Sequence, residues 1–172
     1  GTLAPPDKDL AAEPYETTQG LLEAAGFDAY EVSNHARGEA ARSAHNLHVW
    51  RGGDYLGVGP GAHGRLTLDG VRTATVARRS IIDYLSGVAA ADPWSERDGQ
   101  SPVEAAEERI LLGLRTVEGV ALTDLEAVDL TPETGRFADL LADGFLVRQG
   151  DRIAATATGR PLLDAVLKAL LT

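Results

Sequence analysis

The feature that most constrains this chain is a change of sequence pattern across a short polar segment, residues 92–100. Before this segment the chain reads as a helix, a glycine and a strand, followed by glycine-rich loops. After it, capping boxes and apolar residues at helical spacing continue to the C-terminus. The segment itself contains Pro93 and Gly99, which are typical of turns and loops. We therefore predict two domains, residues 1–91 and 101–172, joined by a linker over residues 92–100.

The first part is predicted to contain a helix, a strand, loops and a hairpin. An apolar stripe with Leu10, Leu21 and Leu22 predicts a helix that ends at Gly26. The alternation that follows predicts a strand, so the two elements form the αβ half of an α/β unit. The remaining predictions for this part are a strand over Phe27–Ser33, a loop over residues 34–44, a short strand over residues 54–58, a hairpin around Asp69-Gly70 and a helix from Arg79 to Ala90.

The second part is predicted to be helical with one hairpin. Ser101–Glu104 has the pattern of a capping box with proline at the first helical position, and Thr123–Glu126 is a second capping box. Thr131-Pro132 is predicted to open a third helix, residues 149–151 to turn a hairpin, and residues 162–170 to form a last helix. This order is typical of a winged-helix domain. The predicted fold class is therefore α/β followed by a small α+β domain.

Composition narrows the range of functions. With 172 residues, 44% of them apolar, the chain can bury a sizeable core, but no apolar run is long enough to span a bilayer. The net charge of −10 disfavours nucleic-acid binding, because such proteins carry a basic face. The chain has no cysteine, so its own thiolates form no disulfide, zinc site or iron–sulfur cluster. We expect a cytoplasmic protein, since disulfides are not needed there.

All four histidines, His35, His45, His48 and His63, lie between the first predicted strand and the hairpin. Histidine is the commonest metal ligand, and binding residues concentrate in loops. The spacing of His45 and His48 would let both face one ligand on a helical turn. Alternatively, each imidazole is a polar loop residue or a hydrogen-bonding partner. The stretch lacks the acidic residues of a zinc hydrolase, so we predict no hydrolytic zinc site.

The segment Gly57–Gly64 is the second candidate site. Its glycines allow the backbone to approach a ligand closely. It leads into a hairpin and lacks the helix N-terminus with which a phosphate-binding loop holds an anion. It either faces a ligand or forms a tight turn at a strand edge. The nearby Trp50, Tyr55 and Tyr30 either stack on a flat macrocycle or pack in the core.

The charged residues of the second part are assigned to no catalytic or binding site. Glu104, Glu107 and Glu108 are interpreted as a solvated helix face and a cap, without a catalytic role. Arg115 follows at the end of the predicted helix, where a cation suits the negative end of the helix dipole.

Four segments of the sequence follow one another in order: Tyr30–Asn34, His45–Trp50, Asp54–His63 and Gly113–Gly119. They resemble the YEISN, HNxxYW, dYxGxGxGAH and GLRxxEG segments of the radical-SAM, oxygen-independent coproporphyrinogen III oxidase-like family. Within this family they are most similar to the heme chaperones of the HemW type. Val49 departs from the pattern, because it stands at the tyrosine of HNxxYW.

The resemblance implies that this chain corresponds to one part of a longer protein and that the cofactor-binding residues lie mostly in another part. Residues up to about Ala90 would close a partial (β/α) radical-SAM barrel, and a winged-helix-like domain would follow from Ser101. In the family, the earlier strands hold an iron–sulfur cluster through CxxxCxxC and make most contacts to S-adenosyl-L-methionine. Because this chain has no cysteine, we predict that it is inactive in radical chemistry on its own.

The resemblance also implies binding sites. His45, Asn46 and Trp50 would bind heme, with His45 as the candidate ligand of the heme iron. Arg42 or Arg51 would meet the propionates. The residues expected near S-adenosyl-L-methionine are Gly57, Gly59, Gly61, Ala62 and His63.

We therefore predict a heme-binding, heme-trafficking chaperone portion whose partners are heme or a porphyrin and heme-acceptor proteins. Two alternatives are a portion of a coproporphyrinogen III oxidase of porphyrin biosynthesis and a C-terminal protein-interaction module. A barrel without its other strands leaves sheet edges uncovered, so we also expect a homodimer or poor solubility.

Overall fold

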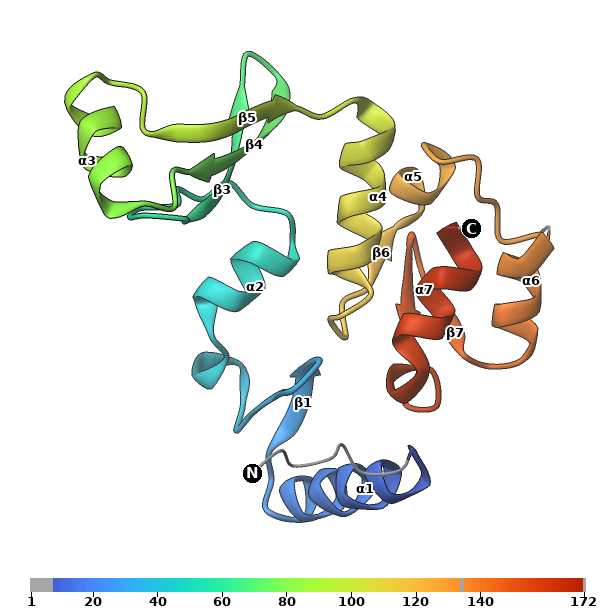
Figure 1. Ribbon diagram of the computed structural model, residues 1–172. Helices are drawn as coiled ribbons and strands as arrows, with labels where there is room; N and C mark the ends of the chain where they lie inside the picture. The colour runs from blue at the N-terminus through green and yellow to red at the C-terminus, as the bar shows by residue number, and fades with distance from the viewer. Residues whose placement is uncertain (1–7, 134, 172) are drawn as a thin grey trace. The chain divides into compact units, whose positions relative to one another are not determined.

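The chain divides into two units, Gly1–Ser43 and Ala44–Thr172, in the computed structural model, which describes residues 8–133 and 135–171 (Figure 1). The first unit contains helix α1 (Lys8–Ala24), strands β1 (Asp28–Glu31) and β2 (Asn34–Ala36), and the 3₁₀ helix η1 (Glu39–Ala41). The two strands pair antiparallel, so the predicted strand is confirmed. Part of the predicted loop 34–44 is strand β2, which pairs with β1. The chain reverses between the two strands at Ser33, which has a φ of 76°.

Helix α1 ends as the sequence predicts. The amide of Phe27 bonds to the carbonyl of Leu22 and that of Gly26 to Glu23, both at 2.9 Å, which is the hydrogen-bond pattern of a glycine C-cap. The side chain of Leu10, placed in the apolar stripe from the sequence, lies outside the described residues. Tyr30 is buried, and its hydroxyl accepts a hydrogen bond from the amide of Ser43 at 3.1 Å. Tyr30 therefore belongs to the core of this unit.

The second unit begins with helix α2 (Ala44–Trp50) and continues into an antiparallel sheet of order β3-β4-β5. The predicted hairpin at Asp69-Gly70 is confirmed, since both residues take the positive φ that a tight two-residue turn requires. The elements of this part are β3 (His63–Leu68), β4 (Val71–Ala77), α3 (Ile81–Ala89) and β5 (Trp94–Gly99).

Two sequence predictions for this part are wrong. Residues 54–58 form no strand: Tyr55 pairs with Arg65 in a single bridge, and residues 56–58 have no regular pairing. The predicted linker 92–100 is largely strand β5, which pairs with β4. Its polar sequence is that of an edge strand whose side chains are mostly exposed, so it carries no apolar alternation.

The rest of the unit contains five helices and a sheet of order β6-β8-β7 within the described residues. The capping box at Ser101 is confirmed: its hydroxyl accepts from the amide of Glu104 at 3.2 Å, and the Glu104 carboxylate accepts from the Ser101 amide at 2.8 Å. The elements are α4 (Pro102–Gly113), β6 (Val120–Ala121), α5 (Leu122–Glu126), α6 (Gly135–Ala142), β7 (Leu146–Gln149), β8 (Arg152–Ala155), η2 (Arg160–Leu162) and α7 (Leu163–Leu171).

The second predicted capping box is wrong. Helix α5 begins at Leu122 and its N-cap, Ala121, offers no side-chain hydrogen bond. Ala121 pairs with Arg152 in the sheet, so β6 runs directly into the helix and Thr123 is already inside it. The third helix begins at Gly135 and not at Thr131-Pro132 as predicted. Pro132 lies in the turn that precedes the helix.

The core of the second half joins α4, α5, α6 and the sheet. Gly119 allows β6 to approach β8: it has a φ of 69°, and a Cβ at this position would collide with the carbonyl of Ile153. The side chains that are almost completely buried are Ile110, Leu114, Val120, Leu125, Phe137, Leu146 and Ile153.

The structure is thus a mixed helix–strand fold whose paired strands, within the described residues, are antiparallel. The barrel-closing role of the first part and the winged-helix assignment of the second stay predictions. None of the described helices has the length and apolar character required to span a membrane.

Candidate functional site

Helix α2 carries the three residues predicted to bind heme. His45 lies in its first turn, is exposed, and makes no hydrogen bond or ion pair with any described residue. Asn46 is half-buried next to it. Trp50 ends the helix and is half-buried, with its indole N–H unpartnered among the described residues. The imidazole of His45 is therefore accessible to a ligand.

His48 has a different role from His45. Its Nε2 donates a hydrogen bond to the carbonyl of Asp54 at 2.7 Å. Gly53 packs against the face of the ring so closely that a Cβ there would collide with the imidazole. His48 thus holds the turn after α2, and its Nε2 is already occupied.

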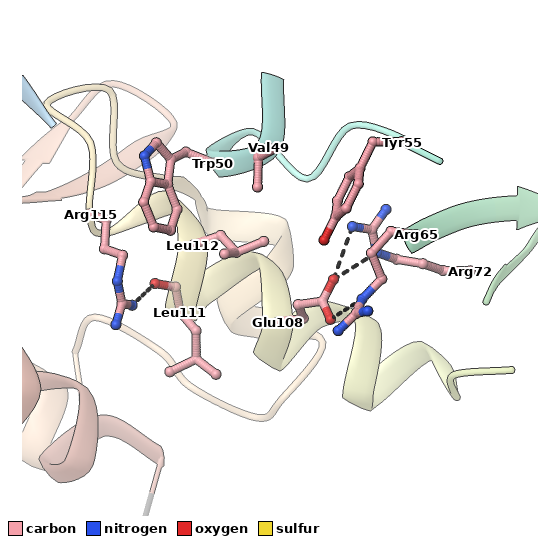
Figure 2. Close-up of a pocket in the computed structure, with 9 residues that line it drawn as sticks. All are labelled: Val49, Trp50, Tyr55, Arg65, Arg72, Glu108, Leu111, Leu112 and Arg115. Carbon is pink, nitrogen blue, oxygen red and sulfur yellow. Dashed lines mark hydrogen bonds and ion pairs between the residues drawn. The ribbon is translucent and has the colours of Figure 1, made fainter. Parts of the chain in front are cut away.

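A pocket of about 360 Å³ lies between α2, the β3–β4 hairpin and α4 (Figure 2). Helix α2 contributes Val49 and Trp50, so the pocket is next to the predicted heme-binding segment. Val49 is the residue that stands at the tyrosine position of HNxxYW. The pocket is lined by Val49, Trp50, Tyr55, Arg65, Arg72, Glu108, Leu111, Leu112 and Arg115.

One end of the pocket is built around the carboxylate of Glu108. It accepts hydrogen bonds from Nε of Arg65 at 2.8 Å, from Nε of Arg72 at 3.0 Å and from the amide of Gln100 at 3.0 Å. The Arg72 side chain is only 8% exposed, and its Nη1 also donates to the carbonyl of Gly52 at 2.7 Å. Its Nη2 lies 2.9 Å from Glu108 Oε1 but outside hydrogen-bonding direction.

The interpretation of Glu108 as part of a solvated helix face is therefore wrong. Its side chain is 16% exposed. In the hairpin register, Arg65 lies opposite Ala74 and Thr67 opposite Arg72, so the two arginines share one face of the hairpin. That face packs against α4, where the buried guanidinium of Arg72 and the half-buried one of Arg65 require an anion.

The carboxylates at this end are held in their charged form. Burial raises the pKa of Glu108, but the hydrogen bonds from Arg65, Arg72 and Gln100 outweigh it, and the net pKa is lowered. The pKa of Asp54 is also lowered, chiefly by the hydrogen bond from the amide of Thr67. Both groups are anionic at neutral pH.

The opposite end of the pocket holds Arg115 and Trp50 (Figure 2). The guanidinium of Arg115 lies 5.7 Å from the centroid of a Trp50 ring, and its Nη1 donates to the carbonyl of Leu111 at 2.5 Å. Figure 2 shows Leu112 and Val49 between this end and Glu108. The pocket thus has an apolar centre with cations at both ends. Sequence reasoning missed this, although Arg115 belongs to the GLRxxEG segment.

The glycine segment forms a turn at the edge of β3. Gly57 packs so closely on the backbone of His63 that a Cβ would collide with its carbonyl, which accounts for this glycine structurally. His63 is exposed at the start of β3. The loop is tied to β4 and α3 by hydrogen bonds from Gly59 N to Tyr84 Oη (3.1 Å), from Gly61 N to Arg78 O (3.0 Å) and from Ala77 N to Ala62 O (2.8 Å).

Other predicted ligands are engaged elsewhere. Nε of Arg51 donates to the carboxylate of Glu118 at 2.8 Å, and Arg42 lies over Tyr30 in the first unit. His35 bonds to Gln19 at 2.7 Å in that unit. Across residues 8–133 and 135–171, no three histidine, cysteine or acidic side chains gather as a metal site. A sequence without cysteine also provides no thiolate for an iron–sulfur cluster.

Comparison with known proteins gives a consistent result. Residues 100–162 match the family described as the HemN C-terminal domain. The chain is 38% identical over 172 residues to the heme chaperone HemW of Mycobacterium tuberculosis, which covers 99% of the chain and 42% of that protein. It is 35% identical over 183 residues to a mitochondrial radical S-adenosyl methionine domain-containing protein 1 of Mus musculus, covering 99% of the chain and 41% of that protein.

A solved structure has a similar fold. The coproporphyrinogen III oxidase HemN of Escherichia coli, described as a radical SAM enzyme, matches with a TM-score of 0.67 at 15% identity, over 97% of this chain and 42% of that one. The chain thus spans about two fifths of the length of the relatives it matches. Over nearly its whole length the chain is thus similar to the C-terminal part of HemW and HemN, and its residues 100–162 match the HemN C-terminal domain.

Proposed function

We propose that this chain is the heme-binding C-terminal portion of a heme chaperone and that heme, as cargo, is coordinated by His45. The observation that carries the proposal is the 38% identity, over 99% of the chain, to a protein named heme chaperone HemW. The accessible imidazole of His45 supports it, because a neutral imidazole is a common axial ligand of heme iron. The handing of heme to acceptor proteins is part of the same proposal.

The surroundings of His45 suit a flat apolar ligand. Val49 is four residues further along α2, so it lies on the same side of the helix as His45. Val49 also lines the pocket that Trp50 and Tyr55 border. A ring bound to His45 would therefore lie at the mouth of an aromatic-lined pocket.

A hemin titration tests the proposal. The wild-type chain is expected to shift the Soret band of hemin, and His45→Ala to abolish that shift. The matched control is His63→Ala, which removes another exposed imidazole from the same unit and should leave the shift intact. An equal shift in wild type and His45→Ala would refute the assignment of His45.

Three finer assignments accompany this proposal. The first part would close a radical-SAM barrel, with Gly57, Gly59, Gly61, Ala62 and His63 near S-adenosyl-L-methionine. Residues 101–172 would form a winged-helix-like domain, which is supported by the order of α4, α5, α6, the β7–β8 hairpin and α7. In the absence of a covering partner, the chain would associate with itself. Radical chemistry would require an iron–sulfur cluster bound outside this cysteine-free sequence.

A further inference from the structure

The pocket beside Trp50 carries a cationic excess in an acidic protein. Three arginines line it against one glutamate, in a chain whose net charge is −10. Its centre is apolar and its borders include Trp50 and Tyr55. A pocket of this kind fits a ligand that joins a flat apolar body to an anionic group.

The three arginines differ in how many of their donor groups are already used in hydrogen bonds within the protein. Arg72 is buried and uses its Nε on Glu108 and its Nη1 on the Gly52 carbonyl. Arg65 uses Nε on Glu108 and Nη1 on the carbonyl of Gly64 at 3.0 Å. Both therefore share the carboxylate of Glu108, and Arg72 also lies 3.5 Å from a carboxylate oxygen of Asp54.

Arg115 is different, because no carboxylate of the described residues pairs with it. Its Nη1 donates to the Leu111 carbonyl, while its Nε and Nη2 have no partner among the described residues. It is half-buried at the Trp50 end of the pocket. A planar guanidinium with two unused donor groups is suited to a carboxylate.

The size of the pocket limits how much of a ligand it takes. About 360 Å³ is near the lower end of the range, roughly 300–1,000 Å³, that is usual for small-molecule sites. Only one edge of a large macrocycle would therefore enter. The rest of the ring would lie outside, on the side of α2 that carries His45 and Val49.

We propose that Arg115 binds a carboxylate of a flat porphyrin-type ring, whose acidic edge enters the pocket between Trp50 and Tyr55. This inference rests on the proposed function and adds the residue that recognises the propionate side of the cargo. Arg115 fixes the orientation of the ring, while His45 coordinates the metal. The two residues therefore contribute to binding through separate parts of the ligand.

The test uses the whole chain and three probes: hemin, metal-free protoporphyrin IX, and the dimethyl ester of protoporphyrin IX. Arg115→Gln should weaken binding of hemin and of protoporphyrin about ten- to hundredfold, the loss expected for one hydrogen-bonded charged group. Arg115→Lys should restore part of it, because it keeps the charge without the fork. Arg97→Gln is the matched control, since it removes the same charge from the exposed strand β5.

The readouts separate this inference from the proposed function. Arg115→Gln should leave the Soret position of bound hemin unchanged, whereas His45→Ala should change it without affecting metal-free protoporphyrin. The dimethyl ester should bind wild type and Arg115→Gln equally. If hemin binding depends on His45 but is indifferent to Arg115→Gln, this inference is overturned and the proposed function stands. If Arg115→Gln weakens the binding of protoporphyrin while His45→Ala leaves hemin binding unchanged, the coordination of heme by His45 is refuted and the role of Arg115 stands.

Discussion

The carboxylate of Glu108 should be a main determinant of stability at the interface between the β3–β4 hairpin and α4. We predict that Glu108→Gln lowers the free energy of unfolding, because it leaves Arg72, with an 8% exposed side chain, without its principal counter-ion. Breaking a buried ion pair from one side costs about 3–5 kcal/mol. Asp54, 3.5 Å from Arg72, and the retained amide oxygen offset part of this cost. The expected loss is therefore about 2–3 kcal/mol.

Urea unfolding at pH 7, followed by circular dichroism, measures this loss. The matched control is Glu107→Gln, the next residue on the same helix, for which no partner is found in the described residues. That change should stay within about 0.5 kcal/mol of wild type. Equal losses in the two variants would refute the role assigned to Glu108.

The difference in stability between wild type and Glu108→Gln should depend on pH in a defined direction. The pKa of Glu108 is lowered in the folded state from its ordinary value of 4.5. Its contribution is thus complete above that value and is lost as the pH falls through the lowered folded pKa. The stability gap between wild type and Glu108→Gln should close under acid. A gap that does not narrow at all as the pH falls below 4.5 would show that lost charge is not its cause.

Three further predictions concern the fold. Gly119→Ala should cost about 3 kcal/mol or more in urea unfolding, because a Cβ collides with the Ile153 carbonyl, whereas Gly144→Ala, also at positive φ but in open space, should cost about 1 kcal/mol. Ser101→Ala should cost about 1 kcal/mol in the same assay through loss of the N-cap of α4, and no change would refute the cap. Helix α3 exposes Ile81, Ile82, Leu85 and Val88, so Ile82→Glu should reduce self-association in light scattering; wild type that is monomeric at all concentrations would contradict this.

The parts of the fold that follow from the sequence are those set by neighbouring residues. The Asp69-Gly70 turn requires two positive φ values, which these residue types tolerate. The capping box at Ser101 likewise depends on groups only three residues apart. Strand β5 was not predicted from the sequence. It pairs with β4 through backbone hydrogen bonds at the edge of the sheet, and its sequence has no alternating apolar pattern.

The candidate site was predictable only in part, for a related reason. His45 and Trp50 share one helix and one motif, so the sequence indicates them together. The burial of Glu108 depends on Arg65 and Arg72, which lie 43 and 36 residues away in the chain. Helical spacing alone does not reveal such a partner. The hairpin register, once predicted, would have placed both arginines on one face and indicated the need for an anion.

Two of the motifs that are distant in the sequence are in contact in the structure. Arg51, directly after the HNxxYW segment, is paired with Glu118 of GLRxxEG, and Arg115 of that same segment lies over Trp50. The Arg51–Glu118 pair is half-exposed and contributes at most about 1 kcal/mol, and the contact of Arg115 with Trp50 is a second link between the two segments. The change of pattern at residues 92–100 thus lies inside a single unit, Ala44–Thr172. The helix that carries His45 is held in place by residues that follow this change, and a ligand bound at α2 would contact both sides of it.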